Sequence, residues 1–180
     1  MTLNLVRRLI KGSPLTASEH DTNLDKLEGR ILRPQSRGQA SRTTTGSIVI
    51  TDVNVYVSTG LTAVLDASTA SGLGLGTTDQ FGLINTSSET RLFLVYGSAD
   101  IADGNNTILG LRLAVNGTSI ATTECRASTS VAGQEAKLVT NALVQLAAGD
   151  EVSLFVANHT NTVDLDLRRG RIVATEIYPV

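Results

Sequence analysis

Hydrophobic and polar residues alternate over short stretches from residue 48 to the C-terminus. Such alternation is typical of strands with one face in a core and the other in solvent. Turn residues separate the stretches, and no helical period interrupts them. The predicted strands cover residues 48–50, 53–57, 61–65, 91–96, 109–115, 142–146, 152–156, 163–167 and 172–180. The pattern predicts a mainly β fold, an antiparallel jelly-roll sandwich, over residues 47–180.

Two polar turns are predicted to close β-hairpins within this domain. Asn116 and Gly117 follow an alternating stretch directly, and both residue types tolerate the positive φ of a tight hairpin turn. Residues 147–150, Ala-Ala-Gly-Asp, join the stretches 142–146 and 152–156. We expect those two stretches to pair as a second hairpin.

The residues before this domain follow a helical pattern instead. Thr16 and Glu19 have the spacing of a capping box, in which each side chain bonds the other residue's backbone amide. Leu24, Leu27 and Ile31 then recur on one face of a helix. The spacing predicts one short helix over about residues 16–28.

Residues 33–46 have no period and almost no large apolar side chain. We therefore predict a flexible linker over this stretch. The domain organisation that follows is an N-terminal anchoring arm, residues 1–46, and a β jelly-roll domain, residues 47–180.

Charge is distributed unevenly along the chain. The net charge is −2, but residues 1–42 hold eight Lys and Arg against four Asp and Glu, and the remainder holds seven against thirteen. The chain thus has a basic arm and an acidic body, and the overall charge does not favour nucleic acid as a partner. No stretch of 18 apolar residues is present, so we expect no membrane partner either.

Few residues carry candidate chemistry. His159 lies in a polar turn, where we expect a solvated side chain, and His20 has no neighbouring ligand. Cys125 is the single cysteine and is expected to be a small buried residue or a strand residue. Residues 72–76 are glycine-rich but lack the strand before and the helix after that a phosphate loop requires. Residues 100–106 offer oxygen atoms without the spacing of a calcium loop. We expect no enzyme, no catalytic residues, no metal and no cofactor.

The start of the arm resembles a motif near the N-terminus of many bacteriophage fibre and other virion appendage proteins. The resemblance is carried by residues 12–24, especially Leu-Thr at 15–16 and Glu-His-Asp-x-Asn-Leu at 19–24. It implies that the arm attaches the protein to other virion proteins. The arm residues expected to bind the partner are Leu5, Val6, Arg7, Arg8, Leu9, Ile10, Leu15, Glu19, Leu24, Leu27 and Ile31.

The body resembles the trimeric jelly rolls of the tumour-necrosis-factor and complement globular-head type, a fold that phage cement proteins and fibre knobs reuse. The resemblance rests on residues 142–156, with Leu-x-x-Gly-Asp-x-Val at 146–152, and on the closing strand. It implies a homotrimer. The residues expected at the trimer interface are Tyr96, Leu165, Leu167, Ile177 and Tyr178.

Together these patterns suggest a structural protein of a phage virion, made in the host cytoplasm. We expect a trimeric capsid decoration (cement) protein, anchored by its N-terminal arm to the major capsid protein. Aromatic residues are only 3% of the chain, whereas a receptor-binding knob uses aromatic platforms for sugar rings. The alternative is a short tail fibre, a tail-tip adaptor or a receptor-binding knob, which the N-terminal motif favours.

Overall fold

The computed structural model describes Thr16, Ser18 and residues 35–68, 70–79, 81–102 and 106–177. The chain divides after Pro34, and the unit from Gln35 onward contains all the strands that are described. The helix predicted over residues 16–28 lies outside the described residues, apart from Thr16 and Ser18. The strands are β1 (Arg37–Arg42), β2 (Gly46–Ile48), β3 (Val57–Ser58), β4 (Val64–Leu65), β5 (Leu73–Leu75), β6 (Gly82–Asn85), β7 (Arg91–Ala102), β8 (Thr107–Val115), β9 (Thr118–Ser119), β10 (Cys125–Thr129), β11 (Glu135–Leu146), β12 (Glu151–Asn158) and β13 (Leu165–Glu176).

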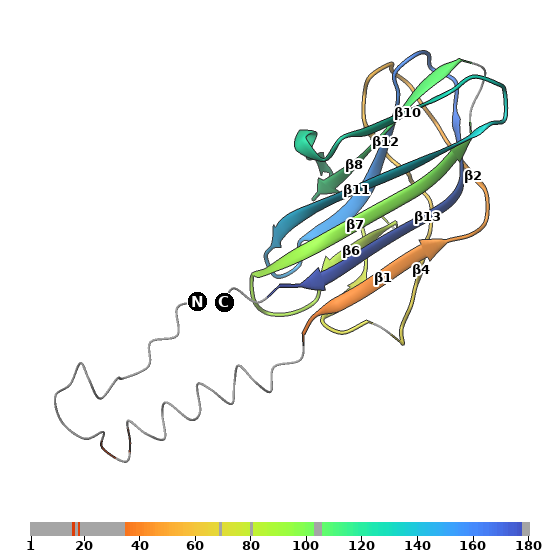
Figure 1. Ribbon diagram of the computed structural model, residues 1–180. Coiled ribbons are helices and arrows are strands. Elements are labelled where there is room, and N and C mark those ends of the chain that lie inside the picture. Colours follow the sequence, from red (N-terminus) through yellow and green to blue (C-terminus); the bar gives the residue numbers. More distant parts are fainter. Residues whose placement is uncertain are drawn as a thin grey trace. The chain divides into compact units, whose positions relative to one another are not determined.

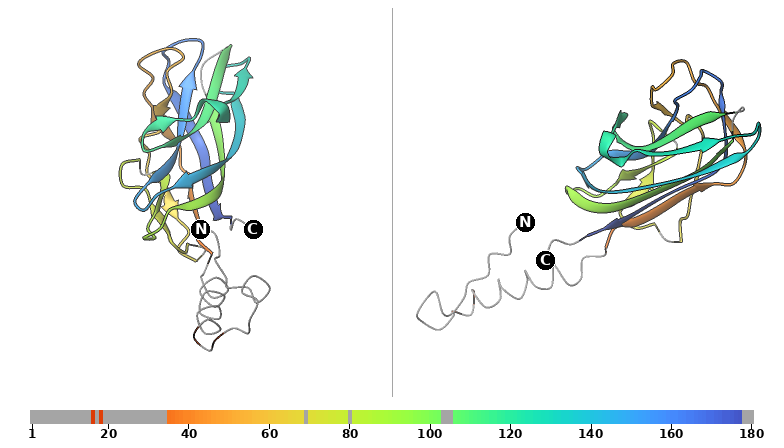
Figure 2. Two further views of the ribbon diagram at one scale, coloured as in Figure 1. Left: turned by 90° about the vertical axis from the view of Figure 1, so that its left-hand side faces the viewer. Right: turned by 45° about the horizontal axis from the view of Figure 1, so that its top comes forward.

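Two antiparallel sheets pack face to face in the described part of the chain (Figures 1 and 2). The first sheet has the order β11-β7-β13-β1-β4, and β2 pairs with the first three residues of β13, 165–167. The second sheet has the order β10-β8-β12-β6-β5, with β3 beside β12 and β9 beside β8. Strands distant in sequence lie side by side in both sheets, as in a jelly roll. The predicted fold class is confirmed.

The core lies between the two sheets and is built from aliphatic side chains with two phenylalanines. Alternate residues of each long strand point inward, as the two-residue period of a strand requires. Large apolar side chains from both sheets are completely buried there: Phe81, Phe93, Leu83, Ile101, Leu109, Leu111, Leu113, Leu138, Leu146, Leu154, Leu165 and Leu167.

The linker predicted over residues 33–46 is wrong where the structure describes it. Residues 37–42 form β1, which pairs along its whole length with β13 and also contacts β4. Its inward side chains are small: Gly38 lies against Leu73, and Ala40 is fully buried. Because these inward side chains are small, the strand shows no hydrophobic pattern in the sequence. Its backbone hydrogen bonds to β13 hold it in place instead. The body therefore begins at Gln35 rather than at residue 47.

The two predicted hairpins have different outcomes. Asn116 and Gly117 form the tight turn between β8 and β9 with φ of 48° and 78°, which confirms the first. The second is wrong, because β11 pairs with β7 in the first sheet and β12 pairs with β8 in the second. Residues 147–150 carry the chain from one sheet to the other. Asp150 supports this crossing, since its carboxylate accepts the backbone N–H of Ala147 at 2.8 Å.

Deleting β1 should therefore unfold the body. We expect a chain beginning at Gln35 to melt cooperatively by circular dichroism, and a chain beginning at Ser47 to lose that transition. The reason is that removing β1 exposes the edge of β13 and uncovers the inward-facing residues beside Ala40. Equal melting temperatures for the two chains would contradict the role assigned to β1.

Candidate functional site

The outer face of the first sheet is the side away from the core, and it is apolar at its centre. Tyr96 on β7 lies between Asn141 on β11 and Val173 on β13, and in the next row Leu94 lies opposite Leu143. These side chains alternate with fully buried core residues, so they point away from the core. We call the following set the apolar face: Leu94, Tyr96, Val139, Leu143 and Val173.

The side chains of the apolar face are open to solvent. The exposed fractions are 62% for Leu143, 46% for Leu94 and 40% for Tyr96. Charged residues take over further along the same strands, where Asp100 lies in register with Lys137 and with Arg169. The outer face therefore has an apolar centre and a charged end.

Only some of the residues predicted at a trimer interface lie on the outer face of the first sheet. Tyr96 lies in the apolar face, and Ile177, just after β13, is half-buried and donates its backbone N–H to Leu92 O at 2.8 Å. Leu165 and Leu167 are completely buried in the core of the protomer, so their assignment to an interface is wrong. Strand alternation separates two faces without saying which one meets the core. Tyr178 lies outside the described residues.

The arm residues predicted to bind a partner also lie outside the described residues. They are Leu5, Val6, Arg7, Arg8, Leu9, Ile10, Leu15, Glu19, Leu24, Leu27 and Ile31. The described chain nevertheless shows how the body is held where the arm joins it.

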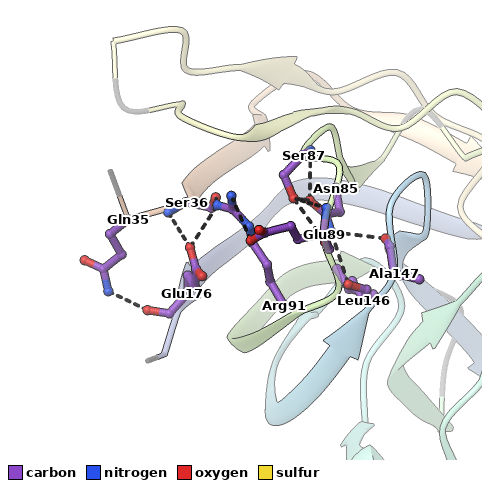
Figure 3. A network of polar contacts seen from close by, with 9 residues as sticks. All are labelled: Gln35, Ser36, Asn85, Ser87, Glu89, Arg91, Leu146, Ala147 and Glu176. Carbon is purple, nitrogen blue, oxygen red and sulfur yellow. Dashed lines mark hydrogen bonds and ion pairs between the residues drawn. The ribbon is translucent and has the colours of Figure 1, made fainter. Parts of the chain in front are cut away.

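Four side chains hold the start of β1 against the end of β13 (Figure 3). Glu176 is 2% exposed, and its Oε2 accepts the backbone N–H of Ser36 at 2.8 Å and Nη1 of Arg91 at 3.1 Å. Arg91 also donates to the Ser36 hydroxyl, and the Gln35 amide donates to the backbone carbonyl of Glu176. We call Gln35, Ser36, Arg91 and Glu176 the junction clamp.

A second hydrogen-bond network, centred on Asn85, holds the turn that precedes Arg91 of the junction clamp (Figure 3). Asn85 is 1% exposed, and its Nδ2 donates to the backbone carbonyls of Glu89, Leu146 and Ala147. Its Oδ1 accepts the backbone N–H and the hydroxyl of Ser87. The turn that precedes Arg91 is thus bonded to the crossing after β11. Sequence reasoning missed both networks, because their members lie up to 141 residues apart.

A cavity of about 200 Å³ lies at the second sheet, beside the buried carboxylates of Asp79 and Glu151. Glu151 accepts the backbone N–H groups of Thr77, Thr78 and Asp79. Asp79 accepts the Ser58 hydroxyl at 2.6 Å, and burial raises its pKa above the usual range although this bond lowers it. Because N–H donors surround the Glu151 carboxylate, it anchors the loop at residues 77–79 and does not suit a cation.

The described residues offer little other site chemistry. Among them, no three His, Cys, Asp or Glu side chains gather as metal ligands. No helix in the described part of the chain is long and apolar enough to span a bilayer. Cys125 is a partly buried residue of β10, as the sequence predicted.

Comparison with known proteins shows the fold. No family model matches the chain, and no curated protein matches it. The structure of the Eiger tumour necrosis factor of S. frugiperda is similar at 16% identity and a TM-score of 0.57, over 82% of this chain and 96% of that one. Murine APRIL is similar at 11% identity and a TM-score of 0.55, over 80% and 100%. The globular domain of a zebrafish complement 1qA protein gives a TM-score of 0.46 at 11% identity, over 82% and 100%.

The junction clamp should contribute strongly to stability. Replacing Arg91 with Leu removes an ion-pair partner from the buried Glu176 carboxylate, and breaking a buried pair typically costs about 3–5 kcal/mol. We expect a loss of that size in the free energy of unfolding measured with urea.

The matched control is the ion pair between Arg168 and Asp166, whose side chains are 39% and 44% exposed. Arg168→Leu should cost less than about 1 kcal/mol, because water screens an exposed pair. Similar losses for the Arg91 and Arg168 variants would show that the clamp adds no more than a surface contact.

Proposed function

We propose that this protein is a structural protein of a tailed-phage virion, a homotrimer that decorates the capsid and is anchored by its N-terminal arm. The observation that carries the self-association is the apolar face of the first sheet. A soluble protein seldom leaves a contiguous cluster of large apolar side chains in water unless a partner covers it. The partner in this proposal is a second and a third copy of the chain.

The free energy available from covering the apolar face is adequate for assembly. Fully burying one Leu, Val or aromatic side chain contributes roughly 1.5–3 kcal/mol. Leu94, Tyr96, Val139 and Leu143 are each partly exposed in the protomer, so together they supply several kcal/mol per subunit. Closed rotational symmetry repeats this gain at every interface of the oligomer. The resemblance of the sequence to trimeric jelly rolls favours threefold symmetry.

The placement in a virion is supported by the motif at residues 12–24 and by the junction clamp. An arm that anchors a particle protein transmits load to the body at Gln35, and the body is densely bonded at that point. Three arms on one trimer would bind with higher avidity than one, since the second and third attachments become intramolecular. No step of the proposal requires catalysis.

The oligomeric state tests the role of the apolar face. Light scattering of the chain beginning at Gln35 should give three times the protomer mass. Val139→Glu with Leu143→Glu should give monomers, because two charges would be buried without partners. Val131→Glu is the control, since Val131 is 64% exposed in the loop before β11 and lies off the apolar face. A monomeric parent chain, or a trimer that survives the double substitution, would overturn this assignment.

The virion location needs a separate experiment. Negative-stain imaging of particles with a labelled copy should place the label on the head, and deletion of residues 1–34 should leave a folded trimer that no longer attaches. Label confined to the tail would favour the short fibre or adaptor instead. Attachment of the deleted chain at normal occupancy would place the anchor in the jelly roll.

A further inference from the structure

The outer face of the second sheet is covered by the protein's own chain, unlike that of the first. On β12, Phe155 and Ala157 point away from the core, yet they are 8% and 0% exposed. On the neighbouring β8, Gly110 has no side chain, and Tyr56 and His159 occupy the space above it. A Cβ at Gly110 would lie 2.3 Å from Tyr56 Oη and 2.6 Å from His159 Nε2. The segment that carries Tyr56 therefore forms a lid on this sheet.

Tyr56 is held by one carboxylate and two arginines. Its hydroxyl donates to Glu124 Oε1 at 2.6 Å, and Arg112 lies over its ring at 4.0 Å from the centroid. Arg112 and Arg126 each donate to the same Glu124 oxygen at 3.0 Å. The Tyr56 hydrogen bond is the main cause that lowers the pKa of Glu124 to about 2, so this carboxylate stays charged. Burial raises the pKa of Tyr56, which stays neutral.

His159 completes the cluster, and its side chain is 4% exposed. The prediction of a solvated turn residue is therefore wrong. Its Nδ1 lies 2.7 Å from Asn54 Oδ1, while its Nε2 lies 3.3 Å from Tyr56 Oη and 3.7 Å from Glu124 Oε1. Asn54 belongs to the covering segment, and its backbone N–H donates to Asn158 O at 2.9 Å. One imidazole thus holds both Asn54 and Tyr56 in place.

The surroundings of His159 disfavour a charged imidazole. A proton added to it would be a third positive charge, next to Arg112 and Arg126, and among the described residues Glu124 is the carboxylate that faces it. Burial, and then the charge of Arg126, lower the pKa of His159 below its ordinary value of about 6.5. The closed cluster therefore contains neutral His159.

We propose that Asn54, Tyr56 and His159 form an acid-sensitive latch, in which protonation of His159 releases residues 52–56, just before β3, and uncovers the outer face of β8 at Gly110 and of β12 beside it. This inference does not depend on the proposed virion role. Release would expose the small apolar surface formed by Gly110 and Ala157.

The direction of the pH effect follows from linkage. The released state protonates near pH 6.5, whereas the latched state does so only at lower pH. The latch is therefore fully stable above pH 6.5 and weakens as the pH falls toward the pKa of His159 in the latched state.

Hydrogen exchange of the full chain tests the latch. With rates corrected for intrinsic exchange, amides of residues 52–56 should exchange faster at pH 5.5 than at pH 7.5. Because pH 5.5 is one unit below the pKa of a released histidine, the increase should reach at most about tenfold. His159→Gln, which cannot titrate, should give the same protection at both pH values. Asp79→Asn is the control and should keep the acid response.

A second variant decides the question even where His159→Gln fails to fold. Arg126 is 51% exposed, so Arg126→Gln should fold, and the loss of its charge raises the pKa of latched His159. The acid-induced increase in exchange should then shrink. A pH-independent exchange rate in the parent chain, or an undiminished acid response in either His159→Gln or Arg126→Gln, would overturn the latch.

Discussion

Each sheet of the sandwich has two faces, and the shared core covers only one of them. This constraint accounts for the rest of the molecule. On the second sheet the chain itself covers part of the outer face, since Tyr56 and His159 lie over Gly110, beside Ala157, and leave no room for a side chain at position 110. The first sheet has no such cover within the described residues, and it presents Tyr96 and Leu143 to solvent. One outer face is thus partly closed by the chain itself, and the other is open to solvent in the protomer.

The fold was predictable from sequence where the pattern is local. Strand alternation gave the jelly roll, and the preference of Asn116 and Gly117 for positive φ gave the turn between β8 and β9. The errors arise where long-range contacts decide the structure. β1 is hydrogen-bonded to a strand more than 120 residues away and has only small inward side chains, so the sequence shows no apolar alternation that would predict this strand.

The sites were harder to predict, for a related physical reason. Alternation along β13 shows that Leu165 and Leu167 share a face, but only the packing of the two sheets shows that this face is the core. His159 looked like a turn residue because its partners, Asn54 and Tyr56, lie more than 100 residues earlier in the chain. The Glu176 carboxylate likewise meets Ser36 and Arg91 only in the folded chain.

The position of β1 has a mechanical consequence. The residues up to Pro34 lead through Gln35 and Ser36 into β1, which runs along β13 with six residues in register. Hydrogen bonds of an antiparallel pair lie perpendicular to the strands. A pull on the arm along the strand direction therefore loads all of these bonds in shear at once, rather than unzipping them one by one. The junction clamp adds its side-chain bonds at the point where the tension is applied. Pulling β1 out of the sheet along the strand direction therefore requires all of these bonds to break together.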